Sequence, residues 1–404
     1  MKLLQINTTV NSGSHGRIAE DIGLIALGAG HKSYIAASYV NALSHSEVIK
    51  IGNTFDRQFH GFKTRFFDRH GFGSTFSTKL LVKKIERIKP DIIHLHNIHG
   101  YYLNVKVLFE YLKKENVPVV WTFHDCWPFT GHCSYFDRVN CLKWQTECHH
   151  CPNKNVYPAS WLLDNSRKNF RQKKELFTGL RKMMLVAPCR WMEGNLRNSF
   201  LAVYEIRVIY NGIDINIFRP VDSEAVRKKY DLNNKYVLGI ASIWTKRKGL
   251  QDFFKLRRLL DKDIDIVLAG LNRRQCKSLP YGIKGIMRTE NTDELAALYS
   301  GAEVFVNPTY VDNFPTVNLE ALACGTPVIT YNTGGSPEAI DEKTGRVVEK
   351  GNIEKLAEEI NSILIYGKQN YTANCRKRAV DNFDKNSLFQ KYISLYNDLL
   401  SNVI

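Results

Sequence analysis

Long hydrophobic runs are missing from this 404-residue sequence. No apolar stretch approaches the ~18 residues that a membrane-spanning helix needs. The first residues, MKLLQIN, turn polar too early for a secretory signal peptide. Internal repeats and low-complexity segments are missing as well. These absences predict a cytoplasmic protein.

Acidic residues are fewer than basic ones. The chain has 40 Asp and Glu against 56 Lys and Arg, a net charge of +16. Most of the excess lies in residues 1–210, with 29 basic and 16 acidic side chains, whereas residues 211–404 have 27 and 24. Such a positive field favours an anionic partner, which can be nucleic acid, an anionic lipid surface or a phosphorylated substrate. Ordinary solubilising charge is the alternative.

Short apolar strand patterns alternate with loops and helical patterns, which predicts an α/β fold with parallel sheets. The length suits two domains of about 200 residues each. The predicted strands are 3–6, 91–95, 117–123 and 183–187 in the first domain, and 236–241, 264–269, 304–306 and 328–330 in the second. The helical patterns include 17–27, 293–299, 353–365 and 370–400.

Residues 304–340 are the most informative stretch and predict strand, loop, helix, strand, loop and a further helix from Glu338. In open α/β sheets, ligands bind beyond the carboxyl ends of the strands, where helix N-termini attract anions. A phosphate-bearing ligand is therefore expected here. Asp312 in the loop and Glu320 in the helix can contact one ligand. Taken alone, they can equally be a turn residue and a helix-face charge.

The run DNFPTVNLEALACGTPV, residues 312–328, resembles the signature of the retaining family 4 glycosyltransferases of the GT-B fold. In that signature an acidic residue precedes Glu by eight positions, and Ala-x-Ala-x-Gly-x-Pro-Val follows. The string NGID at 211–214, with FRP at 218–220, is a second hallmark. The resemblance spans nearly the whole chain and points to colanic-acid and exopolysaccharide-type transferases. This chain departs from the pattern at Asp312, where Glu is usual, and at Pro315-Thr316, where Gly is common.

The resemblance implies two doubly wound Rossmann-like domains that face each other across a cleft. We expect an acceptor-binding domain over residues 1–213, with a Cys-rich insertion at about 126–152. A nucleotide-sugar-binding domain over residues 214–385 should follow. The last helix, 386–404, is expected to cross back to the first domain.

The resemblance also implies a donor site that needs no cofactor for catalysis. Lys248 would bind the diphosphate, Glu320 the ribose hydroxyls, and Asp312 and His124 the donor sugar. Arg247 would replace an Arg that the family carries a few residues earlier. The further expected donor-binding residues are Gly13, Gly16, Arg288, Phe314, Pro315, Thr316 and Val317. From residue type alone, the glycines can simply shape a turn, His124 can be a strand-end turn residue, and Arg247 can be a solvated surface residue.

Five of the nine cysteines lie within residues 126–151. In a reducing compartment such a cluster favours a metal over disulfides. Four thiolates would form a closed tetrahedral zinc site, which is structural because no position remains for water. The predicted ligands are Cys133, Cys141, Cys148 and Cys151. Disulfides or unconnected thiols are the alternatives.

Two other segments carry weaker signals. Residues 55–84 interleave aromatic and basic side chains without a clear helical or strand period, which indicates an acceptor-facing or membrane-facing surface segment, or an ordinary loop. His94, His96 and His99 have no acid at ligand spacing, so we interpret them as core or cleft histidines rather than metal ligands.

The sequence predicts an enzyme that moves a sugar from a UDP- or GDP-sugar to a lipid-linked oligosaccharide. The expected process is the synthesis of a capsule or other surface polysaccharide, at an anionic inner membrane face. A nucleotide-sugar epimerase or hydrolase of the same fold is an alternative, and so is an inactive relative, because of Asp312. A zinc-knuckle nucleic-acid-binding protein is disfavoured, because residues 101–150 hold five basic and five acidic side chains.

Overall fold

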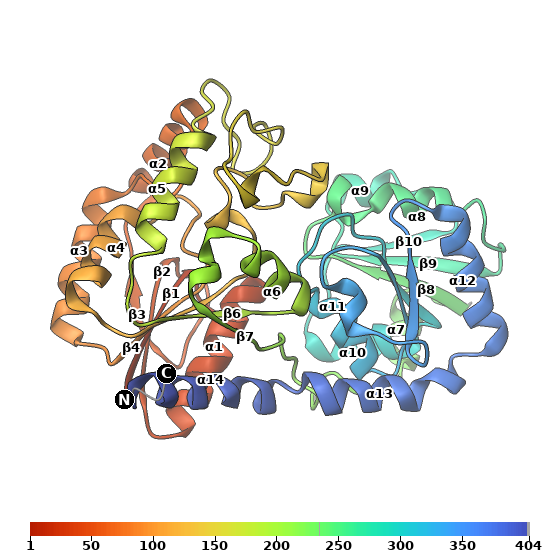
Figure 1. Cartoon of the computed structure of the whole chain (residues 1–404). Coiled ribbons are helices and arrows are strands. Elements are labelled where there is room, and N and C mark those ends of the chain that lie inside the picture. Colours follow the sequence, from red (N-terminus) through yellow and green to blue (C-terminus); the bar gives the residue numbers. More distant parts are fainter. Residues whose placement is uncertain (234, 402–404) are drawn as a thin grey trace. The chain divides into compact units, whose positions relative to one another are not determined.

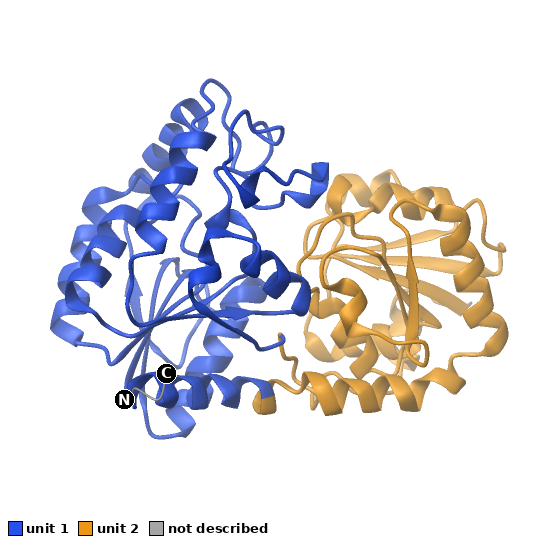
Figure 2. Cartoon of the chain, in the orientation of Figure 1, with its two compact units in different colours: residues 1–210, 388–404 blue, residues 211–387 orange. Residues whose placement is uncertain are grey.

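The computed structural model describes residues 1–233 and 235–401, which form two compact units (Figures 1 and 2). Unit 1 comprises residues 1–210 and the last segment from Leu388 on, and unit 2 comprises residues 211–387. Each unit holds one all-parallel sheet with helices packed against it. The α/β prediction is confirmed.

Unit 1 has a seven-stranded sheet in the order β3-β2-β1-β4-β5-β6-β7. The central strands β4, β5 and β6 are buried along their whole length, as expected for parallel strands covered on both faces. The strand order reverses between β1 and β4, which makes this point the expected ligand-binding edge. The strands are β1 (Lys2–Thr9), β2 (Lys32–Tyr39), β3 (Glu47–Lys50), β4 (Ile92–Leu95), β5 (Val119–Thr122), β6 (Met183–Ala187) and β7 (Glu205–Val208).

Residues 55–84, predicted to lack a helical period, lie in two helices, α2 and α3, except for residues 68–74 between them. The prediction was wrong because α2 buries the polar residues His60 and Thr64 and exposes phenylalanines, so no conventional apolar stripe marks its inner face. The unit 1 helices before the C-terminal one are α1 (Gly13–Gly28), α2 (Thr54–Phe67), α3 (Thr75–Ile88), α4 (Val105–Glu115), α5 (Ser166–Phe177) and α6 (Arg190–Arg197).

Unit 2 has a six-stranded sheet in the order β10-β9-β8-β11-β12-β13, and its strand order reverses between β8 and β11. Its strands are β8 (Lys235–Ile240), β9 (Ile264–Ala269), β10 (Ile283–Ile286), β11 (Val304–Asn307), β12 (Val328–Tyr331) and β13 (Gly345–Val348). Its helices are α7 (Glu224–Lys229), α8 (Leu250–Leu256), α9 (Arg273–Lys277), α10 (Thr292–Gly301), α11 (Thr316–Ala323), α12 (Ile353–Tyr366) and α13 (Gln369–Phe383). The helix expected from Glu338 is only a 3-10 turn, Ser336–Ala339, because Ile340 is already extended and leads to β13.

The long helix predicted over 370–400 is two helices, α13 and α14 (Lys385–Leu400), separated at Asp384. The extended backbone of Asp384 pairs with Ile213, and a Cβ on Gly212 would lie 2.4 Å from the Lys385 Cα. Only glycine fits there, which accounts for the Gly of the NGID string. Beyond this point α14 packs into the core of unit 1. Its buried residues there are Leu388, Phe389, Tyr392, Ile393, Leu395, Tyr396 and Leu399.

The core of unit 2 is tightly packed at Gly239 in β8. A Cβ at this position would lie 2.4 Å from the Phe253 Cζ and 2.8 Å from the Leu268 Cδ2. We expect Gly239→Ala to lower the free energy of unfolding by about 1–3 kcal/mol through overpacking. The matched control is Gly194→Ala in α6, where a Cβ meets nothing within 4 Å. Thermal unfolding should show an unchanged or higher Tm for the control and a lower Tm for Gly239→Ala. Equal Tm values would contradict this packing.

Candidate functional site at the switch point of the second sheet

The loops that follow β8 and β11 meet at the switch point of unit 2. The Lys248 ammonium forms an ion pair with the Asp312 carboxylate. The Arg247 guanidinium lies 4.0 Å from the same carboxylate and donates a 2.6 Å hydrogen bond to the carbonyl of Val311. The Tyr310 backbone N–H in turn donates to the carbonyl of Arg247 at 2.8 Å. Two cations and one carboxylate are thus held together where an open α/β sheet binds its ligand.

Helix α11 begins directly after this loop and carries Glu320. The Tyr299 hydroxyl donates a 3.0 Å hydrogen bond to the Glu320 Oε2. Burial, together with the negative charge of Glu320, raises the pKa of Tyr299 well above its ordinary value. The phenol therefore stays protonated and remains a donor. Glu320 itself is only 9% exposed, so its carboxylate is held in one orientation.

Gly334, in the loop after β12, supports the loop that holds Asp312. Its φ is +52°, and a Cβ would lie 1.8 Å from the Asp312 carbonyl oxygen. The adjacent Gly335 N–H donates to the carbonyl of Asn313 at 2.6 Å. A side chain at Gly334 would push the Asp312 loop away. From the sequence alone, the two glycines are only part of the predicted loop before Glu338.

The other residues of unit 2 that were predicted to bind the donor sugar nucleotide lie at several places in this unit. Thr316 and Val317 lie in the first turn of α11, directly after Pro315. Phe314 is buried, and its ring centre lies 5.9 Å from that of Phe383. Arg288 is exposed and follows the edge strand β10, with β9 between that strand and β8. Sheet order therefore separates Arg288 from the Lys248 and Asp312 pair.

In unit 1, His124 follows β5 and belongs to a hydrogen-bonded chain. Its Nε2 lies 3.1 Å from the Nδ1 of His96, whose Nε2 lies 2.9 Å from the Oε1 of Gln5. The Gln5 Nε2 donates to the carbonyl of Ala19 at 2.7 Å, so its Oε1 must accept. His96 therefore carries its proton on Nε2, and His124 donates from Nε2. Burial and the neighbouring ring lower the pKa of His124 well below its ordinary value, which keeps it neutral.

A second chain of this kind joins β4 to β5. The His99 Nε2 lies 2.7 Å from the Asp125 Oδ2, and the His99 Nδ1 lies 3.2 Å from the His70 Nε2. His94 bonds the hydroxyls of Thr122 and Tyr396. The three histidines of the predicted strand segment thus have protein partners, as core and cleft residues do. Sequence reasoning missed Gln5 and His70, because neither stands in a recognisable motif.

Local structure explains why glycine occupies positions 13 and 16, after β1. Gly13 has φ +67°, a left-handed conformation that favours glycine. A Cβ on Gly16 would lie 2.6 Å from the Thr9 Oγ1. Both glycines shape the start of α1, and their contact with a donor stays a prediction.

The four cysteines predicted as zinc ligands line one small cavity, together with His132, Phe136 and Trp144. The Gly131 N–H donates to the Cys148 Sγ at 3.2 Å, and burial raises the pKa of the Cys148 thiol to about 12. All nine cysteines are free thiols. Over residues 1–233 and 235–401, however, no three His, Cys, Asp or Glu side chains are arranged to hold a metal ion. Zinc at this cavity stays a prediction.

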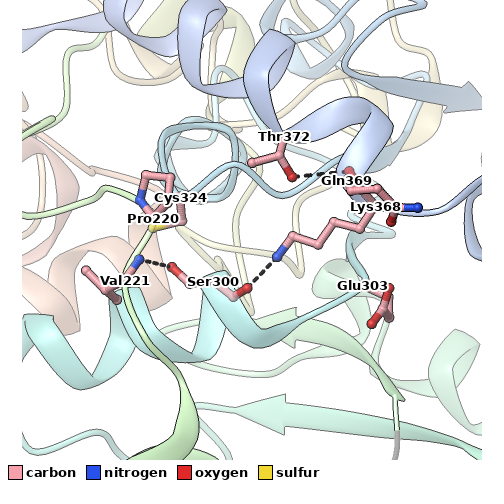
Figure 3. A pocket seen from close by; sticks show the side chains of 8 residues that line it. All are labelled: Pro220, Val221, Ser300, Glu303, Cys324, Lys368, Gln369 and Thr372. Carbon is pink, nitrogen blue, oxygen red and sulfur yellow. Dashed lines mark hydrogen bonds between the residues drawn. The ribbon is translucent and has the colours of Figure 1, made fainter.

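A larger cavity of about 340 Å³ lies in unit 2 at the C-terminal ends of α10 and α11 (Figure 3). The Lys368 ammonium donates to the carbonyl of Ser300 there, and the Val221 N–H donates to the Ser300 Oγ at 3.2 Å. Burial lowers the pKa of Lys368 to about 8. This cavity adjoins the amino ends of β11 and β12, the edge opposite to Lys248 and Asp312. We interpret Lys368 as a cap for the carbonyls of α10.

Two family descriptions together cover most of the chain. Residues 24–217 match Glycosyltransferase Family 4, and residues 222–381 match Glycosyl transferases group 1. The chain thus carries a Glycosyltransferase Family 4 domain followed by a Glycosyl transferases group 1 domain. The resemblance carried by residues 312–328 is confirmed.

Relatives of this glycosyltransferase bear names from polysaccharide biosynthesis. WcaC of Escherichia coli K12, named for colanic acid biosynthesis, is 25% identical over 99% of this chain and 100% of its own. CapM of Staphylococcus aureus, named for capsular polysaccharide biosynthesis, is 27% identical over 47% of this chain and 53% of its own. An N-acetylgalactosaminyltransferase of Campylobacter jejuni is 29% identical over 52% and 58%. The chain thus spans all of WcaC and about half of the other two.

Solved structures show the same fold. The sucrose-phosphate synthase of Thermosynechococcus elongatus matches 99% of both chains with a TM-score of 0.74 and 18% identity. Anabaena HepE in complex with UDP matches 98% of this chain and 99% of its own, with a TM-score of 0.69 and 16% identity. The predicted GT-B class, with two Rossmann-like domains, is confirmed.

The hydrogen bond from Tyr299 to Glu320 should matter for nucleotide affinity. We expect Tyr299→Phe to weaken the binding of the cognate nucleoside diphosphate about tenfold, because a hydrogen bond to a charged group contributes about 1.5–3 kcal/mol. The matched control is Tyr236→Phe, which removes a buried hydroxyl that bonds the carbonyl of Leu298 and not Glu320. Titration calorimetry should show unchanged affinity for the control. Equal losses in both variants would contradict an orienting role for Tyr299.

The cysteine cavity can be tested for metal directly. We expect about one zinc ion per purified chain by plasma mass spectrometry, lost in the Cys148→Ser/Cys151→Ser variant. Cys276→Ser, in α9 of unit 2, is the control and should keep the metal. A metal-free wild type with all thiols titratable would support unconnected thiols instead.

Proposed function

We propose that this family 4 enzyme is a retaining hexosyltransferase that uses a nucleotide-sugar to extend a lipid-linked glycan in surface polysaccharide biosynthesis. The observation that carries the proposal is the cluster of Lys248, Arg247 and Asp312 at the switch point of the second sheet. This cluster combines cations for a diphosphate with a carboxylate for sugar hydroxyls.

The donor would bind by exchanging partners with this cluster. A diphosphate carries more negative charge than one carboxylate, so it would draw Lys248 and Arg247 toward it. Asp312 would then be released to accept hydrogen bonds from the donor sugar, while Glu320 holds the ribose. The N–H groups of the first turn of α11 would add further stabilisation. HepE, which is solved with UDP and with UDP-glucose, supports a nucleoside diphosphate donor such as a UDP- or GDP-sugar.

Transfer with retention would take place on one face of the donor sugar. The bond between the anomeric carbon and the phosphate oxygen breaks, and the acceptor oxygen bonds to that carbon from the same side. The acceptor's proton passes to the departing phosphate oxygen. Lys248 would stabilise the charge that develops on this leaving group. His124, neutral and oriented by His96, would contact the donor sugar.

The names of relatives and the charge distribution support the acceptor class. The name of the Campylobacter jejuni enzyme specifies a diphospho-undecaprenol acceptor. WcaC and CapM are named for colanic acid and capsular polysaccharide. The 13 excess basic side chains of residues 1–210 suit a diphosphate-bearing lipid at an anionic membrane face. We therefore propose action at the cytoplasmic side of that membrane.

The proposal is tested by supplying UDP- and GDP-hexoses with a polyprenyl-diphosphate-linked sugar in detergent. We expect a product whose new linkage keeps the donor's anomeric configuration, as read by NMR. Lys248→Ala should lower kcat/KM about 100-fold or more. Lys246→Ala, an exposed lysine in the same turn, is the matched control and should change it little. An inverted linkage would contradict retention.

The same assay distinguishes a transferase from the alternative enzymes of the same fold. A nucleotide-sugar epimerase or hydrolase would release a new sugar or a free nucleotide without any acceptor. Acceptor-independent turnover as fast as turnover with the acceptor would overturn the transferase assignment.

A further inference from the structure

Unit 1 exposes an aromatic surface that takes no part in the sites described above. Phe55 is 77% exposed, Trp161 62% and Leu162 64%, all unusually high for large apolar side chains. We call this surface the aromatic patch and define it as Phe55, Phe59, Phe62, Phe66, Phe67, Trp161, Leu162 and Leu163.

Half of the aromatic patch is a single stripe along α2. At about 100° per residue, the phenylalanines at 55, 59, 62 and 66 fall within about 60° of the helix circumference. The opposite face carries His60, Gly61 and Thr64, all buried. The helix thus turns its apolar face outward and its polar face inward, the reverse of an ordinary surface helix.

The inward face is locked by His60. Its Nε2 accepts hydrogen bonds from the N–H groups of Gly71 and Gly73, each at 3.2 Å, and its Nδ1 lies 3.0 Å from the Ser74 Oγ. Burial lowers the pKa of His60 to about 3, so the ring stays neutral and Nε2 stays an acceptor. Turning α2 over to bury its phenylalanines would break all three hydrogen bonds. The aromatic patch therefore has to face outward.

The segment around Trp161 is fixed to the end of α2. The backbone N–H of Trp161 donates to the carbonyl of Arg65 at 2.7 Å. The backbone N–H of Leu163 donates to the carbonyl of Phe66 at 3.3 Å. The Asn165 Nδ2 donates to the carbonyl of Phe67 at 2.8 Å. These bonds satisfy carbonyls that the last helical turn leaves without helical partners. Trp161 and the two leucines are therefore held on the surface as part of one structure.

Basic side chains flank the stripe. The Lys63 ammonium lies 4.7 Å from the ring centre of Phe59, and the Arg65 guanidinium lies 5.6 Å from that of Trp161. Exposed Trp, Phe and Leu beside Lys and Arg are typical of helices that lie in a membrane interface. A second copy of the chain fits less well, since both residues 1–210 and residues 211–404 hold more basic than acidic side chains.

We propose that the aromatic patch docks unit 1 onto an anionic lipid bilayer. None of the helices in the described part of the chain has the length and apolarity to cross a membrane, so the contact is interfacial. The inner face of α2 adjoins the histidine chain that follows β4, because the ring of His60 lies 6.0 Å from that of Tyr101, which lies 4.8 Å from that of His70. The His70 Nε2 in turn lies 3.2 Å from the His99 Nδ1. Docking would thus bring a lipid headgroup close to the carboxyl edge of β4 and β5. Only this last step rests on the proposed function.

The test is sedimentation of the full chain with phosphatidylcholine vesicles, with and without about 30 mol% phosphatidylglycerol. We expect binding to the anionic vesicles, at least about tenfold weaker in Phe59→Ser/Phe62→Ser, because this variant no longer buries two aromatic side chains in the bilayer interface. Ile365→Ser/Tyr366→Ser is the matched control, an exposed apolar pair at the end of α12 in unit 2, and should bind like wild type. Equal binding of all three proteins, or equal binding to both vesicle types, would overturn the proposal. The proposal would also be overturned if the wild type forms a dimer in solution that is lost in Phe59→Ser/Phe62→Ser and kept in the control variant.

Failure of docking and failure of the proposed function give different results. If docking is correct, Phe59→Ser/Phe62→Ser keeps wild-type turnover of a short-chain, water-soluble acceptor and loses turnover of an acceptor embedded in anionic vesicles. If the wild type binds anionic vesicles through the patch but transfers no sugar to either acceptor, docking stands and the proposed function falls. Unchanged turnover of the embedded acceptor in the variant would contradict a role for docking in catalysis.

Discussion

The ion pair between Lys248 and Asp312 joins the two loops that leave adjacent strands at the switch point of the second sheet. Its geometry depends on the fold around it. The register of β8 and β11 brings the loops side by side, and glycine at 334 lets the next loop lie against the carbonyl of Asp312. The pair thus holds a cation and a carboxylate at one place. In the proposed complex the cation would bind the diphosphate, and the carboxylate would bind the sugar.

Unit 1 uses the same sheet architecture for a different purpose. At its carboxyl edge there are histidines in hydrogen-bonded chains, one of which ends at the Asp125 carboxylate. Two basic side chains of unit 1, Lys63 and Arg65, lie beside the aromatic patch. The two sheets thus carry different polar groups at their carboxyl edges, within one chain that continues from unit 2 to unit 1 through α13 and α14.

Much of the fold could be predicted because parallel strands buried on both faces appear as short apolar runs. The strands at 183–187 and 264–269 have the predicted bounds. The long motif at 312–328 drew attention to Asp312, and the family resemblance to Lys248, which is its ion-pair partner. Helix α2 could not be predicted, because its buried face is polar and held by His60, so the usual link between burial and apolarity is reversed. The break at Asp384 was missed because it depends on pairing with Ile213, far away in the sequence. The place of Arg288 after the edge strand β10 depends on strand order, which no local pattern reveals, and its contact with a donor stays a prediction.

The account depends most on a nucleoside diphosphate site at Lys248, and calorimetric titration with UDP, GDP and ADP tests it most directly. We predict that one of the three binds the wild type, and that Lys248→Ala and Glu320→Ala each weaken this binding by at least about tenfold, since charged hydrogen bonds contribute about 1.5–3 kcal/mol. Binding of none of the three nucleotides, or wild-type affinity in Lys248→Ala, would contradict the account.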